Sequence, residues 1–247
     1  MFPITHIWFS KKVLGYINHL TILGAVFPDP FASKYLTYDD THKCGWAFFD
    51  YIIKGKQELS DFAKAVVTHT VSPKGLDYYA DEQYEGSEGY CFQKAVVIVD
   101  DVINACNIPI EYGLWKAHNF IEMAVEVEIL INNQWIIQSF SEALYDIDIT
   151  NTLESFVELY FNLEPCSMKN AFKRLESFVK ITGTTSYDFA LQYDLVMQRR
   201  HGINIDVGKS SKIIEICREI INEDFTGFIN DVEHKVKNTL FNRLELD

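Results

Sequence analysis

The stretch from Asp61 to Tyr84, DFAKAVVTHTVSPKGLDYYADEQY, changes from a helical pattern into an acidic loop. Its apolar residues recur at helical spacing, and they predict a helix that ends at His69. Pro73 then turns the chain, so that acidic side chains beyond it can fold back towards the histidine. These acidic residues are Asp77, Asp81 and Glu82. The stretch therefore predicts the centre of a metal site, and the rest of the chain is searched for partners of His69.

The length and composition predict one soluble globular domain over residues 1–247. Hydrophobic residues make up 48% of the chain and charged residues 23%, close to the averages of globular proteins. A chain of this length can bury a sizeable core, and 12 Gly and 6 Pro leave little room for linkers. We expect residues 1–132 to form the half that carries the metal site, and residues 133–247 to complete the core.

The formal net charge of −13 excludes some classes of partner. Long nucleic acids require a basic surface, which 22 Lys and Arg against 35 Asp and Glu do not provide. An anionic membrane surface is disfavoured for the same reason. Clustered carboxylates, in contrast, are the ligands of divalent cations, so bound metal would neutralise part of this charge.

The five cysteines are scattered and show no CxxC spacing, which argues against a disulfide framework and a structural zinc knot. We interpret them as reduced thiols of the core. The N-terminal sequence lacks a basic leader with a cleavage site, and no apolar run approaches the length of about 18 residues that a membrane span requires. A cytoplasmic protein without a transmembrane segment is the expectation, and a homo-oligomer is compatible with it.

Apolar periodicity predicts an all-α fold of roughly ten helices, because residues recur at three and four and sustained alternation is missing. The predicted helices span 5–24, 45–53, 60–69, 89–106, 111–133, 135–145, 153–161, 168–181, 187–200 and 209–244, the last with a break near Thr226.

The longest predicted helix carries the sharpest local motif, WKAHNFIEMAVE. His118 and Glu122 stand at i and i+4, so they share one face of the helix, one turn apart. An imidazole and a carboxylate placed in this way can hold one divalent ion, as side chains inside helix bundles do.

Three more histidines, each preceded by threonine, lie in the same half of the chain: His6, His42 and His69. Asp29 stands between two prolines, which stiffen the backbone around its carboxylate. Each histidine alone is equally well explained as a capping or core residue, but their number together with the stiffened aspartate favours a shared site.

These segments resemble the zinc-dependent phospholipase C family, which shares its all-α fold with fungal single-strand nucleases. The similarity covers about residues 4–126 and follows the order THIWFSKKVL, GAVFPDPF, His42 before an aromatic helix, AVVTHTVSPKGLDYYAD and AHNFIE. Members of that family hydrolyse phosphodiesters with a trinuclear zinc cluster. The resemblance implies as metal ligands His6, Asp29, His42, His69, Asp77, His118 and Glu122.

The chain departs from the family pattern in two places. The family has an aspartate four residues after its central histidine, where this chain has Pro73, and Asp77 and Asp81 occupy the region instead. Secreted members also bind one metal through a mature terminal Trp, where this chain has Met1. We therefore expect one or two ions. Zn²⁺ is the first candidate, and the oxygen-rich ligand set is also compatible with Mn²⁺ or Fe²⁺.

The resulting hypothesis is a metal-dependent hydrolase of a small phosphate ester or a lipid-like substrate, with Asp81, Glu82 or Asp40 as a base outside the ligand set. One alternative is a metal- or ligand-binding helical protein without catalytic activity. Another is a histidine-aspartate phosphohydrolase, although that class needs an adjacent His-Asp pair, which this sequence lacks.

Overall fold

The computed structural model of the chain describes residues 1–31, 36–175 and 183–245, and it confirms the all-α prediction. The helices of the first half are α1 (Pro3–Leu14), α2 (His19–Val26), α3 (Pro28–Phe31), α4 (Tyr38–His42), α5 (Gly45–Gly55), α6 (Ser60–His69), α7 (Tyr90–Ala95), α8 (Val99–Cys106) and α9 (Gly113–Asn132). Those of the second half are α10 (Trp135–Tyr145), α11 (Ile147–Phe161), α12 (Ser167–Phe172), α14 (Ser186–His201), α15 (Val207–Asn222) and α16 (Phe225–Leu244).

Short elements join these helices. The 3₁₀ turns are η1 (Gln57–Leu59), η3 (Val96–Ile98), η4 (Ile110–Tyr112) and η5 (Lys173–Leu175), and η2 (Tyr78–Glu82) is a π-helical turn. In the described part of the chain, strands are confined to one antiparallel hairpin of β1 (Gln83–Tyr84) and β2 (Ser87–Glu88). This hairpin was not predicted from the sequence.

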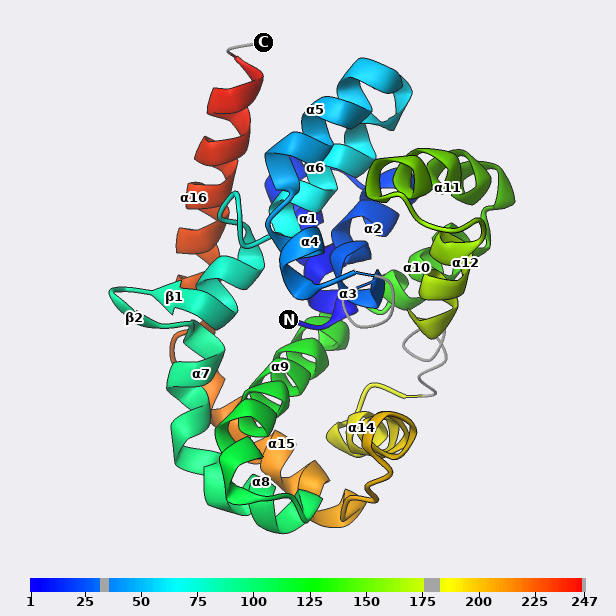
Figure 1. Ribbon diagram of the computed structural model, residues 1–247. Coiled ribbons are helices and arrows are strands. Elements are labelled where there is room, and N and C mark those ends of the chain that lie inside the picture. The colour runs from blue at the N-terminus through cyan, green and yellow to red at the C-terminus, as the bar shows by residue number, and fades with distance from the viewer. Residues whose placement is uncertain (32–35, 176–182, 246–247) are drawn as a thin grey trace.

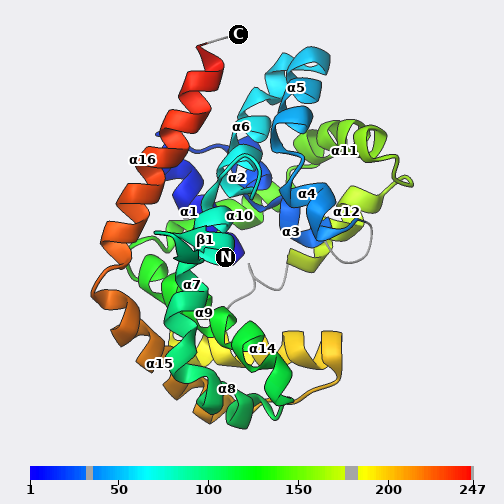
Figure 2. The same ribbon diagram turned by 60° about the vertical axis from the view of Figure 1, so that its left-hand side comes forward.

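The N-terminus lies near the centre of the molecule in both Figure 1 and Figure 2. Helices α2, α5 and α6 lie on one side of it, and α7, α8, α14 and α15 lie on the other. Helix α9 starts in the second group and runs to the centre, where it packs against α1. The two groups of helices thus meet around the N-terminus and α9.

The described residues form fifteen α-helices, where the sequence predicted about ten. The predicted helix 5–24 is two helices, because α1 ends at Gly15 in the left-handed region (φ 83°) and α2 begins after Asn18. Asn18 caps α2 by accepting a hydrogen bond from the backbone N–H of Thr21. A glycine after a helix and an asparagine before the next are the ordinary end and start signals.

Two further boundaries differ from the prediction. Helix α11 starts at Ile147 and not at 153, because Asp146 provides its N-cap by accepting from the N–H of Ile149. The predicted helix 168–181 begins as α12 and continues as η5, while residues 176–182 lie outside the described residues. The predicted break near Thr226 separates α15 from α16.

Helices α2 and α6 are in very close contact at Gly24. A Cβ atom at this position would lie 2.3 Å from the backbone oxygen of Phe62, so a residue with a side chain does not fit without a shift of the helices. The aromatic rings of Phe27, Phe48 and Phe62 pack beside this contact and are fully buried. This packing fixes the end of α6, where His69 lies.

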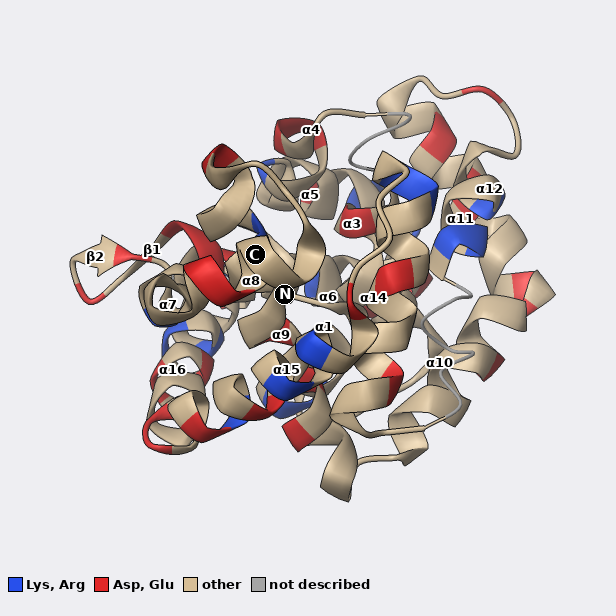
Figure 3. Ribbon diagram, turned by 90° about the horizontal axis from the view of Figure 1, so that it is seen from below, with Lys and Arg blue, Asp and Glu red and all other residues tan. Residues whose placement is uncertain are grey.

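Acidic residues are spread over many helices and do not gather on one of them, as Figure 3 shows. No helix among the described residues is both long and apolar enough to cross a membrane.

Candidate metal centre

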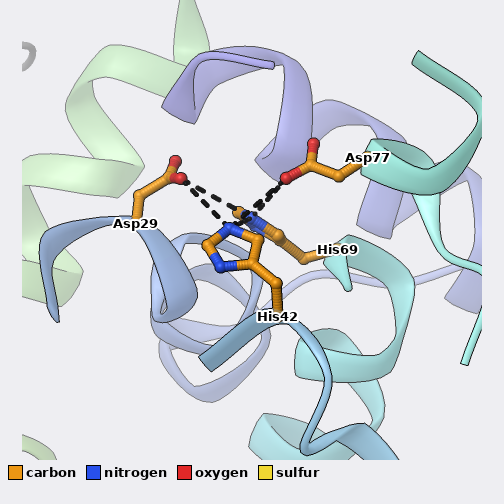
Figure 4. Close-up of side chains that lie close together, drawn as sticks. All are labelled: Asp29, His42, His69 and Asp77. Carbon is orange, nitrogen blue, oxygen red and sulfur yellow. Dashed lines mark hydrogen bonds and ion pairs between the residues drawn. The ribbon is translucent and has the colours of Figure 1, made fainter. Parts of the chain in front are cut away.

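Four side chains from separate segments bring their ligand atoms together, as Figure 4 shows. His42 ends α4, His69 ends α6, Asp29 lies on α3, and Asp77 directly precedes η2. One ligand atom of each residue lies within 4.8 Å of those of the other three. We call this group the four-residue cluster. All four residues were predicted as ligands from the sequence, and the structure brings them together.

The two histidines of the cluster are held so that each presents Nε2 to the centre. Nδ1 of His69 donates a hydrogen bond to the carbonyl oxygen of Ala25 (2.6 Å), and Nδ1 of His42 donates to the carbonyl oxygen of Tyr38 (3.1 Å). The two Nε2 atoms face each other at 3.3 Å. In neutral rings with the proton on Nδ1, both Nε2 atoms would carry lone pairs that repel each other, so this arrangement requires a cation or an additional proton between them.

The carboxylates complete this arrangement. Oδ2 of Asp77 lies 3.0 Å from Nε2 of His69 and 3.5 Å from Nε2 of His42. Oδ1 of Asp29 lies 3.6 Å from Nε2 of His42 and 3.7 Å from Nε2 of His69. Two imidazole nitrogens and two carboxylate oxygens are a common donor set for Zn²⁺ and for other divalent transition metals.

The loop after α6 folds back onto the end of that helix, as the sequence predicted. A Cβ atom on Gly75 would lie 2.7 Å from the carbonyl oxygens of Val67, Thr68 and Thr70, so only glycine permits this approach. The backbone N–H of Val71 also donates to the carbonyl oxygen of His42 at 2.8 Å. The loop thereby holds the end of α4 against the end of α6 and directs Asp77 towards both histidines.

The charges in the cluster shift the pKa values of its members. Burial alone would lower the pKa of His69, but the carboxylates of Asp77 and Asp29 raise it above its ordinary value. Burial alone would raise the pKa of Asp29, but the imidazole of His69 in its charged form and the neighbouring imidazole of His42 lower it to about 2. Burial alone would also raise the pKa of Asp77, but the Met1 ammonium and His69 outweigh this effect and hold the pKa well below its usual range. Both carboxylates are therefore ionised at neutral pH, as metal ligands must be.

A second group of donors lies beside the first and is formed by Asp81, Cys91 and Glu122, whose ligand atoms also lie within 4.8 Å of one another. We call it the second cluster. The terminal ammonium of Met1 lies 3.0 Å from Oε1 of Glu122 and 3.3 Å from Oδ2 of Asp81. His118 is buried next to it, with Nε2 4.0 Å from Oε1 of Glu122. The predicted helical pair His118 and Glu122 therefore faces this cluster and not the first.

His6 lies between the two clusters. Its ring stacks on that of His69 with the centroids 3.5 Å apart, and Nε2 lies 3.1 Å from the carbonyl oxygen of Met1 and 3.2 Å from Oδ1 of Asp77. Burial and the neighbouring His69 lower the pKa of His6 to about 4. Its Nδ1 is buried without a hydrogen-bond partner. The predicted ligand His6 is thus in the centre, in contact with Asp77 but outside both groups of donors.

The three predicted bases have different surroundings. Asp81 belongs to the second cluster, so its place is among the candidate ligands. Glu82 is exposed and lines the adjoining cavity. Asp40 is also exposed, but it closes the capping box of α4 by accepting hydrogen bonds from the N–H and the hydroxyl of Thr37, and it does not line that cavity. The structure therefore places Asp40 in a helix cap away from the cavity, and it does not add support for Asp40 as a base.

A cavity of about 570 Å³ adjoins both clusters. Its wall includes Asp29 and Asp77 from the four-residue cluster, and Asp81 and Glu122 from the second. Aromatic side chains and two arginines form much of the remaining wall: Phe2, Tyr38, Phe92, Trp115, Phe189, Tyr193, Arg174 and Arg200. Phe189, Tyr193 and Arg200 lie on α14, so the second half of the chain completes the cavity around ligands from the first half.

Cys91 is the member of the centre that the sequence did not predict. It was interpreted as a core thiol, and it is indeed completely buried. Its separation from Asp81 and Glu122 along the chain follows no metal-binding spacing. The hairpin β1–β2 leads the chain from Asp81 to α7, and the packing of α7 against α9 brings Cys91 to Glu122. The sequence offered no local signal for this contact.

In comparisons with known proteins, no family model, no curated sequence and no solved structure matches this chain. The assignment of the site therefore rests on its own geometry. Two polar atoms of the centre, Nδ1 of His6 and Oδ1 of Asp81, are buried without a hydrogen-bond partner. Together with the facing imidazole nitrogens, they fit a centre that binds cations.

Proposed function

We propose that this protein is a metal-dependent hydrolase of phosphate esters, in agreement with the hypothesis from the sequence. The observation that carries the proposal is the pair of Nε2 atoms of His42 and His69, which face each other at 3.3 Å between two carboxylates beside a cavity. Structural metal sites are coordinatively closed, whereas a catalytic site needs room for water and substrate. Ligand candidates of both clusters line the cavity, which favours the catalytic role over storage or structural binding.

The residues of the centre differ in the roles that we propose for them in metal binding. The four-residue cluster would hold one divalent ion. Oδ2 of Asp77 contacts His69 in this cluster, while its Oδ1 contacts the Met1 ammonium, which in turn contacts Asp81 and Glu122 of the second cluster. When bound, the metal would supply the charge that lowers the pKa of a water molecule and stabilises the phosphate oxygens as charge develops on them.

The cavity wall supports a substrate with an anionic group and an apolar part. Arg174 and Arg200 bring positive charge to a chain whose net charge is −13, and aromatic rings provide apolar surface next to them. Electrostatic attraction by such groups offsets the repulsion that the acidic protein would exert on a phosphate ester. In the hydrolysis, the oxygen of water forms a bond to phosphorus as the water gives a proton to a base, and the bond from phosphorus to the alcohol oxygen breaks as that oxygen takes up a proton. Glu82 is the candidate base that lies on the cavity wall outside the ligand groups.

The test combines metal analysis with hydrolysis assays on the full chain. The purified protein, supplemented with Zn²⁺ or Mn²⁺, is assayed on bis(p-nitrophenyl) phosphate and on p-nitrophenyl phosphate, and bound metal is measured by plasma mass spectrometry. We expect His69→Ala and His42→Ala to lose bound metal and activity together. The control is His234→Ala, since His234 is hydrogen-bonded to Asn238 on an exposed part of α16.

Two results would reject parts of this proposal. If the metal-loaded wild-type protein hydrolyses neither ester, the alternative function, a metal-binding protein without catalytic activity, describes it better. Variants of His42 and His69 that keep full metal content would remove the basis of the centre itself.

A further inference from the structure

The thiol of Cys91 has surroundings unlike those of the other buried cysteines. Cys91 lies in the first turn of α7, is completely buried and forms no disulfide. Its ligand atom lies within 4.8 Å of those of Asp81 and Glu122. Cys106 and Cys217 are also buried, but they belong to no such group of donors among the described residues. Cys91 therefore faces two carboxylates in addition to the thioether sulfur of Met1, to which its Sγ lies at 3.9 Å, whereas an ordinary core thiol faces apolar side chains only.

The carboxylates of the second cluster already contact one positively charged group. The terminal ammonium of Met1 lies 3.0 Å from Glu122, 3.1 Å from Asp77 and 3.3 Å from Asp81. A second, independent observation is that Oδ1 of Asp81 is buried without any hydrogen-bond partner. A buried, unpaired carboxylate oxygen is costly, and a cation in the cluster would remove that cost.

We propose that the second cluster binds a thiophilic divalent cation, of which Zn²⁺ is the physiological example, through the thiolate of Cys91 together with Asp81 and Glu122. Nε2 of His118, 4.0 Å from Oε1 of Glu122, supplies the fourth donor. One sulfur, one nitrogen and two oxygens make a four-coordinate set that suits zinc. This inference rests on the proposed metal centre, but it does not depend on the centre being catalytic.

The two clusters then differ in the metals that they select. The four-residue cluster offers nitrogen and oxygen, which accommodate Mn²⁺ and Fe²⁺ as well as Zn²⁺, whereas a thiolate favours softer ions such as Zn²⁺, Co²⁺ and Cd²⁺ over Mg²⁺ and Mn²⁺. The sequence led us to expect an oxygen-rich site that accepts Mn²⁺ or Fe²⁺. Cys91 restricts that expectation to the four-residue cluster.

Metal binding at this cluster releases a proton. Burial and the nearby carboxylate of Asp81 raise the pKa of the Cys91 thiol well above its ordinary value, so the thiol is protonated without a cation. On binding, the S–H bond breaks, the sulfur–metal bond forms, and the proton passes to the solvent.

Cobalt substitution tests the proposal by spectroscopy. Co²⁺ bound to a thiolate gives a near-ultraviolet charge-transfer band, which Co²⁺ bound only to nitrogen and oxygen lacks. We expect the Co²⁺-loaded wild-type protein and the control Cys106→Ser to show the band, and Cys91→Ser to lose it. Loss of this ligand should weaken binding by at least the roughly 10- to 100-fold that loss of an outer-shell partner causes. A band that persists in Cys91→Ser, or one that is missing from wild-type protein with bound Co²⁺, overturns the proposal.

A measurement on the wild-type protein covers the case in which Cys91→Ser does not fold. X-ray absorption at the zinc edge separates a Zn–S distance of about 2.3 Å from Zn–N and Zn–O distances of about 2.0 to 2.2 Å. A sulfur shell at about 2.3 Å, the Zn–thiolate distance, supports the proposal, and a shell of nitrogen and oxygen alone overturns it. If the thiolate is found but no ester is hydrolysed, the proposed function fails while this inference stands.

Discussion

Glu126 provides a direct test of the electrostatics of the centre, because it is a buried carboxyl one turn beyond Glu122 on α9. Its side chain is completely buried. Oε1 accepts hydrogen bonds from the backbone N–H of Thr5 (2.6 Å) and from the Thr5 hydroxyl (3.1 Å), and Oε2 has no partner. Burial raises the pKa of Glu126 to about 8, although the hydrogen bonds from Thr5 act against the shift.

This raised pKa makes the stability of the protein depend on pH. The folded state holds the proton of Glu126 more tightly than the unfolded state, so stability falls as pH rises from the ordinary pKa of 4.5 to the folded value of about 8. At about 1.36 kcal/mol per pH unit, the whole interval corresponds to roughly 5 kcal/mol, of which roughly 3 kcal/mol is lost by pH 7. Glu126→Gln keeps an acceptor for Thr5 but removes the charge, so it avoids this loss.

The assay is urea unfolding of metal-free protein between pH 5 and pH 9, with the free energy of unfolding compared between wild type and Glu126→Gln. We expect nearly equal stabilities at pH 5 and a variant that is more stable by several kcal/mol at pH 9. The control is Glu111→Gln at an exposed position, where the difference should not change with pH. If Glu126→Gln is no more stable than wild type at pH 9, the raised pKa of the buried Glu126 carboxyl does not lower the stability of the protein at high pH, and the reasoning is refuted.

The remaining predictions concern packing, metal and substrate. Gly24→Ala should lower the free energy of unfolding by about 1 to 3 kcal/mol in urea titrations, since its Cβ would lie 2.3 Å from the Phe62 oxygen, whereas the control Gly227→Ala has open space and should be stabilising or neutral. Removal of metal by a chelator should lower the melting temperature, and a metal concentration of 100 times Kd should restore about 2.7 kcal/mol in unfolding titrations. Arg200→Gln should raise KM for an anionic ester several-fold at low salt and by less at high salt, with kcat nearly unchanged, because the exposed guanidinium acts through a screened charge.

The part of the site that could be predicted from the sequence is the part that local rules determine. His118 and Glu122 are one turn apart on a helix, and that spacing alone places them on one face. The glycine and proline after His69 correctly indicated a chain that returns to the end of α6, and Asp77 follows from that return. For these residues, short-range geometry was sufficient.

The position of Asp40 also has a local explanation. Thr37 and Asp40 form the T-x-x-D pattern of a capping box, in which the acidic side chain bonds back to the backbone of the cap residue. A carboxylate occupied by a helix cap is a poor base, because its hydrogen bonds stabilise the ionised form.

Cys91 and the Met1 ammonium could not be predicted, because their positions depend on how distant segments pack. Cys91 reaches Glu122 through the packing of α7 against α9, and Met1 reaches it because α1 lies along α9. Helical periodicity describes which face of each helix is buried, but it does not describe which residues of two buried faces meet. The same limit explains why the contribution of α14 to the cavity emerged only from the structure.

The two clusters are connected through the carboxylate of Asp77 and the ammonium of Met1. Oδ2 of Asp77 contacts His69 at 3.0 Å, its Oδ1 contacts the Met1 ammonium at 3.1 Å, and the ammonium contacts Glu122 at 3.0 Å. These charge contacts make the charge state of one cluster depend on the other, so we expect substitutions in the two clusters to have non-additive effects. Asp77 has this position only because the loop after α6 folds back at Gly75. The folding back of the chain after His69 thus connects two neighbouring groups of ligands into one centre.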